Sequence, residues 1–183
     1  MATWIALFRG INVVGNNRLL MKDLVRVLEG EGLTEIRTYI QSGNAIFNSA
    51  RGTPRSLADR IGRAVEARHG FRPRIAILAP RELSEAVAGN PFKAATSEPK
   101  SLHLYFMAEA PPSPDHAALS RIRVGAEAFE FRGRVFYLHT PHGFPTSKLA
   151  ANAERLIGID ATARNWNTVT RLLEMVTIEN APR

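Results

Sequence analysis

The stretch TYIQSGNAIF (residues 38–47) decides the fold of the N-terminal half, because it holds two strands and the turn between them. Alternating strand-forming residues on either side predict strands over residues 35–41 and 44–49. Ser42 and Gly43 form the turn, where glycine permits the positive φ that a tight hairpin needs. The stretch therefore predicts an antiparallel hairpin.

The elements around this hairpin complete a β-α-β-β-α-β order. Residues 3–8 are almost continuously apolar, which is typical of a central strand buried on both faces. Apolar residues at helical spacing predict a helix over residues 20–28, and a second helix begins near Pro54 and ends before Gly70. A strand over residues 74–80 ends at a proline. This order is that of the split βαβ, or ferredoxin-like, unit.

The C-terminal half repeats the order in a degenerate form. We expect a strand over residues 102–107, a helix over 115–123, a hairpin of strands 127–131 and 134–139, and a helix over 147–157. The last strand, near residues 160–164, is expected to be short or missing, and a final helix follows. The sequence thus predicts an α+β fold of two ferredoxin-like halves with antiparallel sheets, the second degenerate. The predicted domains are residues 1–80 and 101–183, joined by a bridging helix and linker over residues 81–100.

Composition favours a folded protein with a basic surface. The 183 residues are 45% hydrophobic, which is enough for a sizeable core. The 24 Lys and Arg against 17 Asp and Glu give a net charge of +7, which suits phosphate-bearing partners. The basic residues are scattered along the chain and form no runs, a pattern typical of a solvated surface.

The chain contains no cysteine, which excludes disulfides, thiol nucleophiles and thiolate metal sites. It shows neither a signal-peptide pattern nor an apolar stretch of transmembrane length. We therefore expect a cytoplasmic protein that does not span a membrane.

Two polar clusters are expected to meet at one end of the first sheet. In a split βαβ unit the first two strands run parallel, so the loops that follow them leave the sheet at the same end. The side chains of this expected site are Arg9, Asn12, Asn16, Asn17, Gln41, Ser42 and Asn44. Gly10, Gly15 and Gly43 would let backbone N–H groups approach a ligand, and the first helix adds partial positive charge at its N-terminus. The cluster suits a phosphate or carboxylate; the alternative is two ordinary turns and a helix cap.

Lys148 marks a second candidate position for an anion. Thr146 or Ser147 can cap the helix predicted over residues 147–157, so Lys148 lies in its first turn, where the helix dipole disfavours a cation. A bound anion would explain this placement. The alternative is an exposed, flexible lysine that tolerates a small cost.

Arg164 and Asn165 mark a third position, in the segment TARNWNTVTRLL. Asn165 or Asn167 can cap the last helix. The guanidinium of Arg164 can hold a carboxylate or phosphate through two hydrogen bonds, although an ion pair within the protein is the commoner use of such a residue.

The residue types of these three candidate positions favour ligand binding over proton transfer. His139 and His142 have no further metal-ligating residue at suitable spacing, so no metal site is predicted. No carboxylate pair and no Ser-His-Asp arrangement stands out. If a reaction occurs, transfer of an anionic group stabilised by basic side chains fits better than proton abstraction. No cofactor and no oligomeric state follow from the sequence.

Four segments resemble the signature segments of the DUF1697 family of uncharacterised, mostly bacterial proteins. They are ALFRGINVVGNNRLLMKDL, RTYIQSGNAIF, SKL and TARNWNTVTRLL, in the same order and across nearly the whole chain. The resemblance implies a cytoplasmic α+β protein with ferredoxin-like halves, and it implies no activity, cofactor or catalytic residue. One departure is Val14, which stands where the family pattern has a second glycine.

Two functions from different classes fit these features. The preferred hypothesis is a small anionic ligand bound by Arg9, Asn12, Asn17, Gln41, Ser42 and Asn44, joined by Lys148, Arg164 and Asn165 if these reach the site. The alternative is a nucleic-acid-binding module, because RNA-recognition motifs share the ferredoxin-like topology. Against it, residues 44–49 lack the basic and aromatic pattern of such motifs. A structural or protein-interaction role would leave the polar clusters as ordinary turns.

Overall fold

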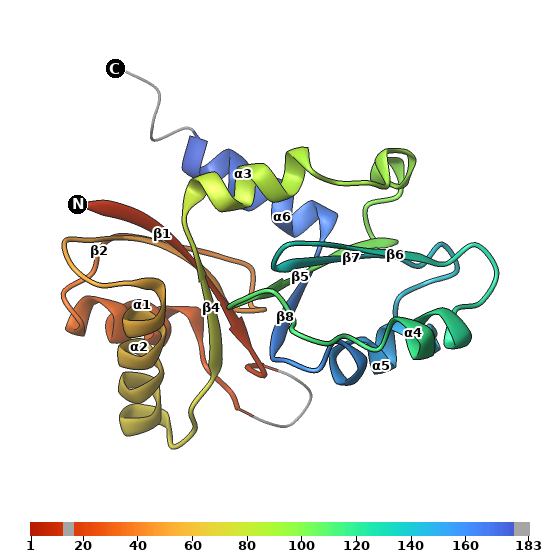
Figure 1. Cartoon of the computed structure of the whole chain (residues 1–183). Helices are drawn as coiled ribbons and strands as arrows, with labels where there is room; N and C mark the ends of the chain where they lie inside the picture. The colour runs from red at the N-terminus through yellow and green to blue at the C-terminus, as the bar shows by residue number, and fades with distance from the viewer. Residues whose placement is uncertain (13–16, 178–183) are drawn as a thin grey trace. The chain divides into compact units, whose positions relative to one another are not determined.

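The computed structural model describes residues 1–12 and 17–177, and its elements are drawn in Figure 1. The described residues form six α-helices, one short 3₁₀-helix and two four-stranded antiparallel sheets. The chain divides into two compact units, one made of Met1–Leu83 with Leu172–Arg183 and the other of Ser84–Arg171. The mixed α/β class predicted from the sequence is therefore confirmed.

The first unit contains the elements predicted around the hairpin. In chain order these are β1 (Ala2–Arg9), α1 (Met21–Gly30), β2 (Thr34–Tyr39), β3 (Asn44–Ser49), α2 (Pro54–His69) and β4 (Arg74–Leu78). The sheet order is β2-β3-β1-β4, with every neighbouring pair antiparallel. Strands β1 and β2 both pair antiparallel with β3, so they run in the same direction. The loops after β1 and β2 consequently leave the sheet at the same end.

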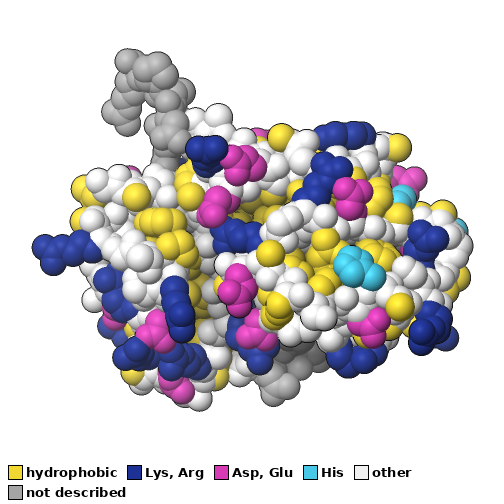
Figure 2. All heavy atoms as spheres, viewed as in Figure 1, with side chains coloured by type: hydrophobic (Ala, Val, Ile, Leu, Met, Phe, Trp, Pro, Cys, Tyr) yellow, Lys and Arg dark blue, Asp and Glu magenta, His cyan; other side chains and the backbone are white. Residues whose placement is uncertain are grey.

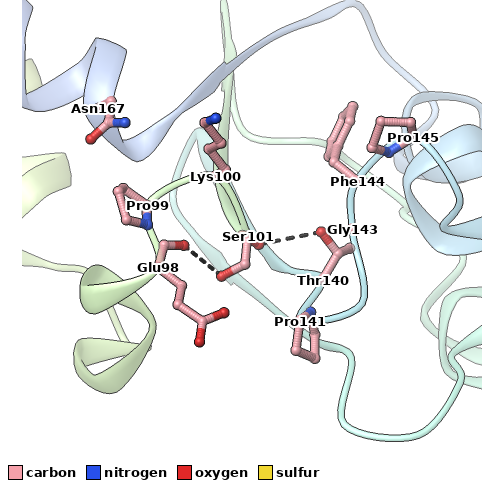
Figure 3. A pocket seen from close by; sticks show the side chains of 10 residues that line it. All are labelled: Glu98, Pro99, Lys100, Ser101, Thr140, Pro141, Gly143, Phe144, Pro145 and Asn167. Atoms are coloured by element: carbon pink, nitrogen blue, oxygen red, sulfur yellow. Dashed lines mark hydrogen bonds between the residues drawn. The ribbon is translucent and has the colours of Figure 1, made fainter.

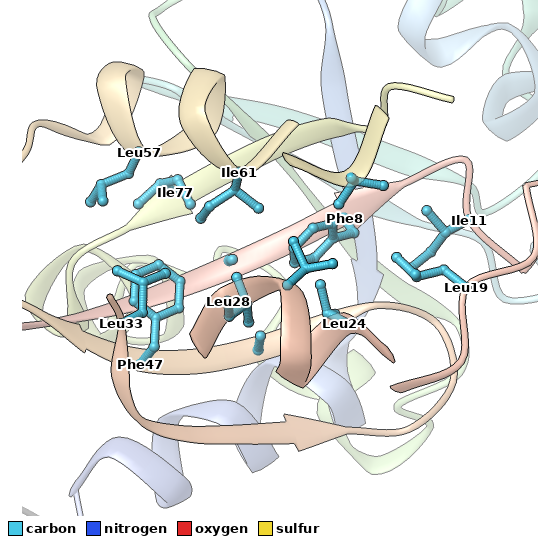
Figure 4. Packing of buried hydrophobic residues seen from close by; sticks show 14 residues of the cluster. Phe8, Ile11, Leu19, Leu24, Leu28, Leu33, Phe47, Leu57, Ile61 and Ile77 are labelled. Carbon is cyan, nitrogen blue, oxygen red and sulfur yellow. The ribbon is translucent and has the colours of Figure 1, made fainter. Parts of the chain in front are cut away.

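Strand β1 is the buried centre of this sheet. Residues 5–8 of β1 are at most 1% exposed, which confirms the prediction of a strand buried on both faces. On one face the helices α1 and α2 pack against the sheet (Figure 4). Leu24 and Leu28 of α1 and Ile61 of α2 contact the same apolar cluster as Phe8 and Phe47 of the sheet. Burying side chains of this size stabilises the unit by about 1.5–3 kcal/mol each.

Local sequence fixes where α2 begins and ends. Thr53 accepts a hydrogen bond from the Ser56 N–H, and the Ser56 hydroxyl accepts one from the Thr53 N–H, so the two residues form a capping box. Pro54 occupies the first helical position, where its missing N–H costs nothing. The helix ends at His69 and is capped by Gly70, whose φ of 76° favours glycine.

The second unit contains the remaining elements. They are most of α3 (Pro80–Ala88), the 3₁₀-helix η1 (Lys93–Ser97), β5 (Leu102–Met107), α4 (His116–Ile122), β6 (Ala128–Arg132), β7 (Val135–His139), α5 (Lys148–Ile157), β8 (Ala161–Asn165) and the start of α6 (Trp166–Thr177). The sheet order is β6-β7-β5-β8, again antiparallel throughout. Helices α4 and α5 pack on one face, where Leu149 and Leu156 join the cluster that contains Phe136 and Leu138.

The last strand of the second sheet, predicted near residues 160–164 as short or missing, is present with five residues. Strand β8 pairs with β5 over five positions, from His103 with Asn165 to Met107 with Ala161. It is as long as β4, its counterpart in the first sheet. The second half is therefore not degenerate in the order of its elements.

No α-helix within residues 1–12 and 17–177 is both long enough and apolar enough to cross a membrane.

Candidate functional site

The two polar loops of the first unit meet, as the strand directions require. The Phe8 N–H donates to the carbonyl oxygen of Gly43 at 2.8 Å, which joins the end of β1 to the β2–β3 turn. Beyond β1, the Asn12 amide nitrogen donates to the carbonyl oxygen of Gln41 at 2.7 Å. The predicted approach of Asn12 to Gln41 is thus found in the structure.

Asn12 uses its side chain to hold the loops together. Its amide nitrogen also donates to the Leu19 carbonyl oxygen at 2.8 Å, and its amide oxygen accepts from the Leu19 N–H at 2.9 Å. Both amide hydrogens are therefore engaged with backbone. The Asn12 φ of 53° lies in the left-handed region, which asparagine tolerates better than most residues. The Asn12 side chain consequently positions the loop.

Asn17 closes the same loop from the other side. Its side-chain nitrogen donates to the Gly10 carbonyl oxygen at 2.8 Å, and its carbonyl oxygen accepts from the Asn12 N–H at 3.1 Å. The predicted site residues Gly15 and Asn16, together with Val14, lie outside the described residues.

Gly43 serves the packing of the two loops. A Cβ atom at Gly43 would lie 2.5 Å from the Ile11 Cδ1 and 2.7 Å from the Phe8 Cβ, so only glycine fits. Its φ is 78°, which also favours glycine. The missing side chain of Gly43 therefore makes room for Phe8 and Ile11 of the protein itself.

The buried side chain of Asn44 stabilises the β2–β3 turn. It is fully buried, and its amide nitrogen donates to the Tyr39 carbonyl oxygen at 3.0 Å and to the Ser42 hydroxyl at 3.1 Å. In the same turn Ile40 has a φ of 48° and is 50% exposed. A β-branched residue in this conformation is strained, so the surrounding contacts hold the turn in place.

Among the predicted site residues of this unit, Asn12, Asn17, Gln41 and Ser42 are exposed. Arg9, at the end of β1, is half-buried. Helix α1 begins here after Leu20, whose side chain makes no capping hydrogen bond. The first N–H groups of a helix without a side-chain cap carry partial positive charge. This end of the first unit therefore combines a guanidinium, an amide, a hydroxyl and a helix N-terminus.

The three remaining predicted residues belong to the second unit. Lys148 is the first residue of α5 and is exposed, directly after Ser147, whose hydroxyl accepts from the Ala150 N–H at 3.0 Å. Asn165 ends β8 and caps α6 by accepting from the Thr168 N–H at 2.9 Å. Arg164 donates to the Ala163 carbonyl oxygen at 2.8 Å, and burial lowers the pKa of its guanidinium to about 10. Lys148 thus keeps the unfavourable first-turn position that the sequence predicted.

A pocket that the sequence did not predict lies within the second unit (Figure 3). It encloses about 520 Å³ and is lined by Glu98, Pro99, Lys100, Ser101, Thr140, Pro141, Gly143, Phe144, Pro145 and Asn167. The segment from Glu98 to Ser101 and the segment from Thr140 to Pro145 are held together because the Thr140 N–H donates to the Ser101 carbonyl oxygen at 2.8 Å. The prolines in these two segments were the sequence feature that could have indicated the pocket. The sequence does not tell, however, which loops become neighbours.

Basic and acidic side chains alternate on the face shown in Figure 2. Asp59 of α2 pairs with both Arg63 and Arg72, which lower the pKa of its carboxyl group. Glu31 pairs with Arg60 at 3.3 Å. Arg60, Arg63 and Arg72 are thus paired with acidic groups. In the described part of the chain, no group of three or more His, Asp or Glu residues could hold a metal ion.

Comparison with known proteins places the chain in a family. Residues 1–137 match the family described as "Protein of unknown function (DUF1697)". No curated protein matches the chain. The structure is similar to that of the conserved bacterial protein SP0830 from Streptococcus pneumoniae, with 20% sequence identity and a TM-score of 0.67 over 94% of this chain and 97% of the other. At this identity the likeness shows a shared fold alone, whereas the family match covers most of the chain. The chain belongs to the DUF1697 family of proteins of unknown function.

Proposed function

We propose that the protein binds a small molecule carrying a phosphate or carboxylate group at the polar loops of the first unit. The observation that carries this proposal is the bridge made by Asn12, which fixes the loop after β1 to Gln41 of the β2–β3 turn beside the start of α1. A preorganised group of polar side chains at a helix N-terminus is a common way to bind an anion.

The side chains divide into two roles. Asn12, Asn17 and Asn44 hold the loops through hydrogen bonds to backbone. Arg9 supplies positive charge, and the exposed Gln41 and Ser42 supply hydrogen bonds that orient the ligand. Because the amide hydrogens of Asn12 are engaged within the protein, its substitution acts on binding through the shape of the loop.

We further propose Lys148, Arg164 and Asn165 as anion-binding residues within the second unit. The first-turn position of Lys148 supports a role in charge neutralisation, and the burial of Arg164 strengthens its interaction with any anion that it contacts. Asn165 acts indirectly, since its side chain caps α6.

We also propose that each half is a ferredoxin-like unit. The element order β-α-β-β-α-β and the sheet orders β2-β3-β1-β4 and β6-β7-β5-β8 support this assignment. In such a unit the loops after the first and second strands lie at one end of the sheet, where the proposed ligand binds.

The proposal is tested by thermal unfolding of the full chain in the presence of phosphorylated metabolites, nucleotides, amino acids and keto acids. A ligand at a hundred times its Kd adds about 2.7 kcal/mol of stability, which raises the Tm of a protein of this size by roughly 5–10 °C. We expect at least one small anion to raise Tm, and Gln41→Ala or Arg9→Ala to abolish the increase. Arg55→Ala is the matched control, because Arg55 is an exposed arginine at the start of α2.

Two outcomes would contradict the proposal. One is the absence of any stabilising anion. The other is stabilisation by single-stranded RNA alone, lost at high salt and on charge reversal of Arg60 and Arg63, which would favour the nucleic-acid alternative.

A further inference from the structure

We infer that the pocket of the second unit is a separate binding site for a small molecule that combines a flat apolar body with a carboxylate group. Its volume of about 520 Å³ falls in the range typical of small-molecule sites. Every lining residue lies between Glu98 and Asn167, so the second unit forms the pocket by itself. The site is independent of the anion site proposed for the first unit.

Rigid apolar groups form much of the pocket wall. Pro99, Pro141, Pro145 and Phe144 line it. The Phe144 ring stacks on His103, with ring centroids 3.7 Å apart and an interplanar angle of 25°. His103 does not line the pocket, so it supports the ring from behind. A fixed aromatic ring beside prolines offers a flat surface on which an aromatic or other planar apolar group can pack.

The hydroxyl groups in the lining are used within the protein. The Ser101 hydroxyl donates to the Glu98 carbonyl oxygen at 2.8 Å, and the Thr140 hydroxyl donates to the Ser101 carbonyl oxygen at 3.3 Å. Both residues are buried, at 6% and 1% exposure. Polar groups of a ligand must therefore bind to other side chains of the pocket.

The polar groups of the lining that can contact a ligand are the exposed side chains of Lys100, Asn167 and Glu98. Among the residues that the structure describes, neither Lys100 nor Glu98 makes an ion pair. In Figure 3 the Lys100 side chain points to the side of the pocket where Asn167 and Phe144 lie, whereas the Glu98 carboxylate points the other way. The end of the pocket beside the aromatic ring is therefore positive, and an ammonium with a neighbouring amide complements a carboxylate.

The test compares two probes that differ only in charge, 2-naphthoate and its neutral amide 2-naphthamide, titrated into the full chain. Binding is followed by naphthyl fluorescence and by amide chemical shifts. We expect 2-naphthoate to bind about three- to fivefold more tightly, as a partly exposed charge contact allows. Lys100→Ala and Asn167→Asp should each remove this preference without weakening the neutral probe. Lys93→Ala, another exposed lysine of the second unit, should leave both affinities unchanged.

A variant that failed to fold would lose binding of both probes, so it would not give this result. An acidic residue at position 167 lies in the first turn of α6, where it favours the helix. Phe144→Leu keeps an apolar side chain but loses the flat ring, so it should weaken both probes alike. The inference is overturned if neither probe binds below about 1 mM. It is also overturned if the two probes bind equally well, or if the shifted amides lie outside residues 98–101, 140–145 and 167.

Discussion

At the scale of single residues, Gly43 shows how tightly the two loops of the proposed anion site are packed. Gly43 and Gly10 have nearly the same φ, 78° and 74°, but a Cβ atom at Gly43 would overlap Phe8 and Ile11, whereas one at Gly10 has nothing within 4 Å. Gly10→Ala should therefore cost about 1 kcal/mol for backbone strain alone. Gly43→Ala should cost about 2–4 kcal/mol, because overpacking is added to the strain.

Urea denaturation of the two variants measures this difference. Equal losses of unfolding free energy at the two positions would mean that the turn moves freely away from β1, and the preorganisation on which the proposed site depends would be lost.

The side chain of His103 should make the stability of the protein depend on pH. Burial lowers the pKa of its imidazole from 6.5 to about 4. Between these two pH values the unfolded chain binds a proton that the folded protein excludes, so the free energy of unfolding falls as pH decreases from 6.5 toward 4. The shift corresponds to roughly 3 kcal/mol over that window.

The variant His103→Phe keeps a ring against Phe144 and removes the titrating group. Its stability, measured by urea denaturation from pH 7 to pH 4, should decline less steeply than that of the parent. Parallel curves for the two proteins would show that His103 does not resist protonation.

At the scale of elements, Asn12 connects the loop after β1 to the β2–β3 turn and to the residues before α1. It makes three side-chain hydrogen bonds to backbone, whereas Asn17 makes one, and both residues have a φ near 50°. Glycine keeps this backbone conformation, so Asn12→Gly and Asn17→Gly remove the hydrogen bonds with little strain. We expect losses of about 2–3 and about 1 kcal/mol respectively, measured by urea denaturation. Asn12→Gly should also abolish ligand-dependent stabilisation, and retention of that stabilisation would contradict the positioning role.

Local sequence was sufficient for most elements and insufficient for those that depend on distant partners. Pro54 and Gly70 mark the two ends of α2 directly, so its bounds could be predicted. Strand β8 reads ATARN and has no apolar run, and it is a strand because it pairs with β5, some 60 residues earlier in the chain. The sequence left open whether this strand forms, because pairing across such a separation leaves no local signal.

The candidate sites show the same division. The meeting of Asn12 with Gln41 followed from the directions of β1 and β2, which the element order implies. The engagement of the Asn12 amide with Leu19 did not follow, because it depends on the detailed path of the loop. The pocket beside Phe144 was missed for a related reason, since its walls come from loops whose neighbours only the tertiary structure reveals.

At the scale of the whole molecule, the excess of positive charge is a weak guide to function. The net charge is +7, but Arg60 and Arg63 of α2 are paired with Glu31 and Asp59. Composition alone could not distinguish this paired surface from a continuous basic patch. The last part of the chain also escaped prediction, because Leu172–Arg183 is assigned to the first unit and Arg37 donates to the Met175 carbonyl oxygen at 2.9 Å.

The most direct test of the central claim is a titration of the full chain with inorganic phosphate, followed by amide chemical shifts. Anion binding at the polar loops predicts saturable shifts at Gly10, Met21, Gln41 and Ser42 that disappear in Arg9→Ala, while amides remote from the loops stay unchanged. Absence of saturable shifts at these amides, or shifts confined to other residues, would contradict the account.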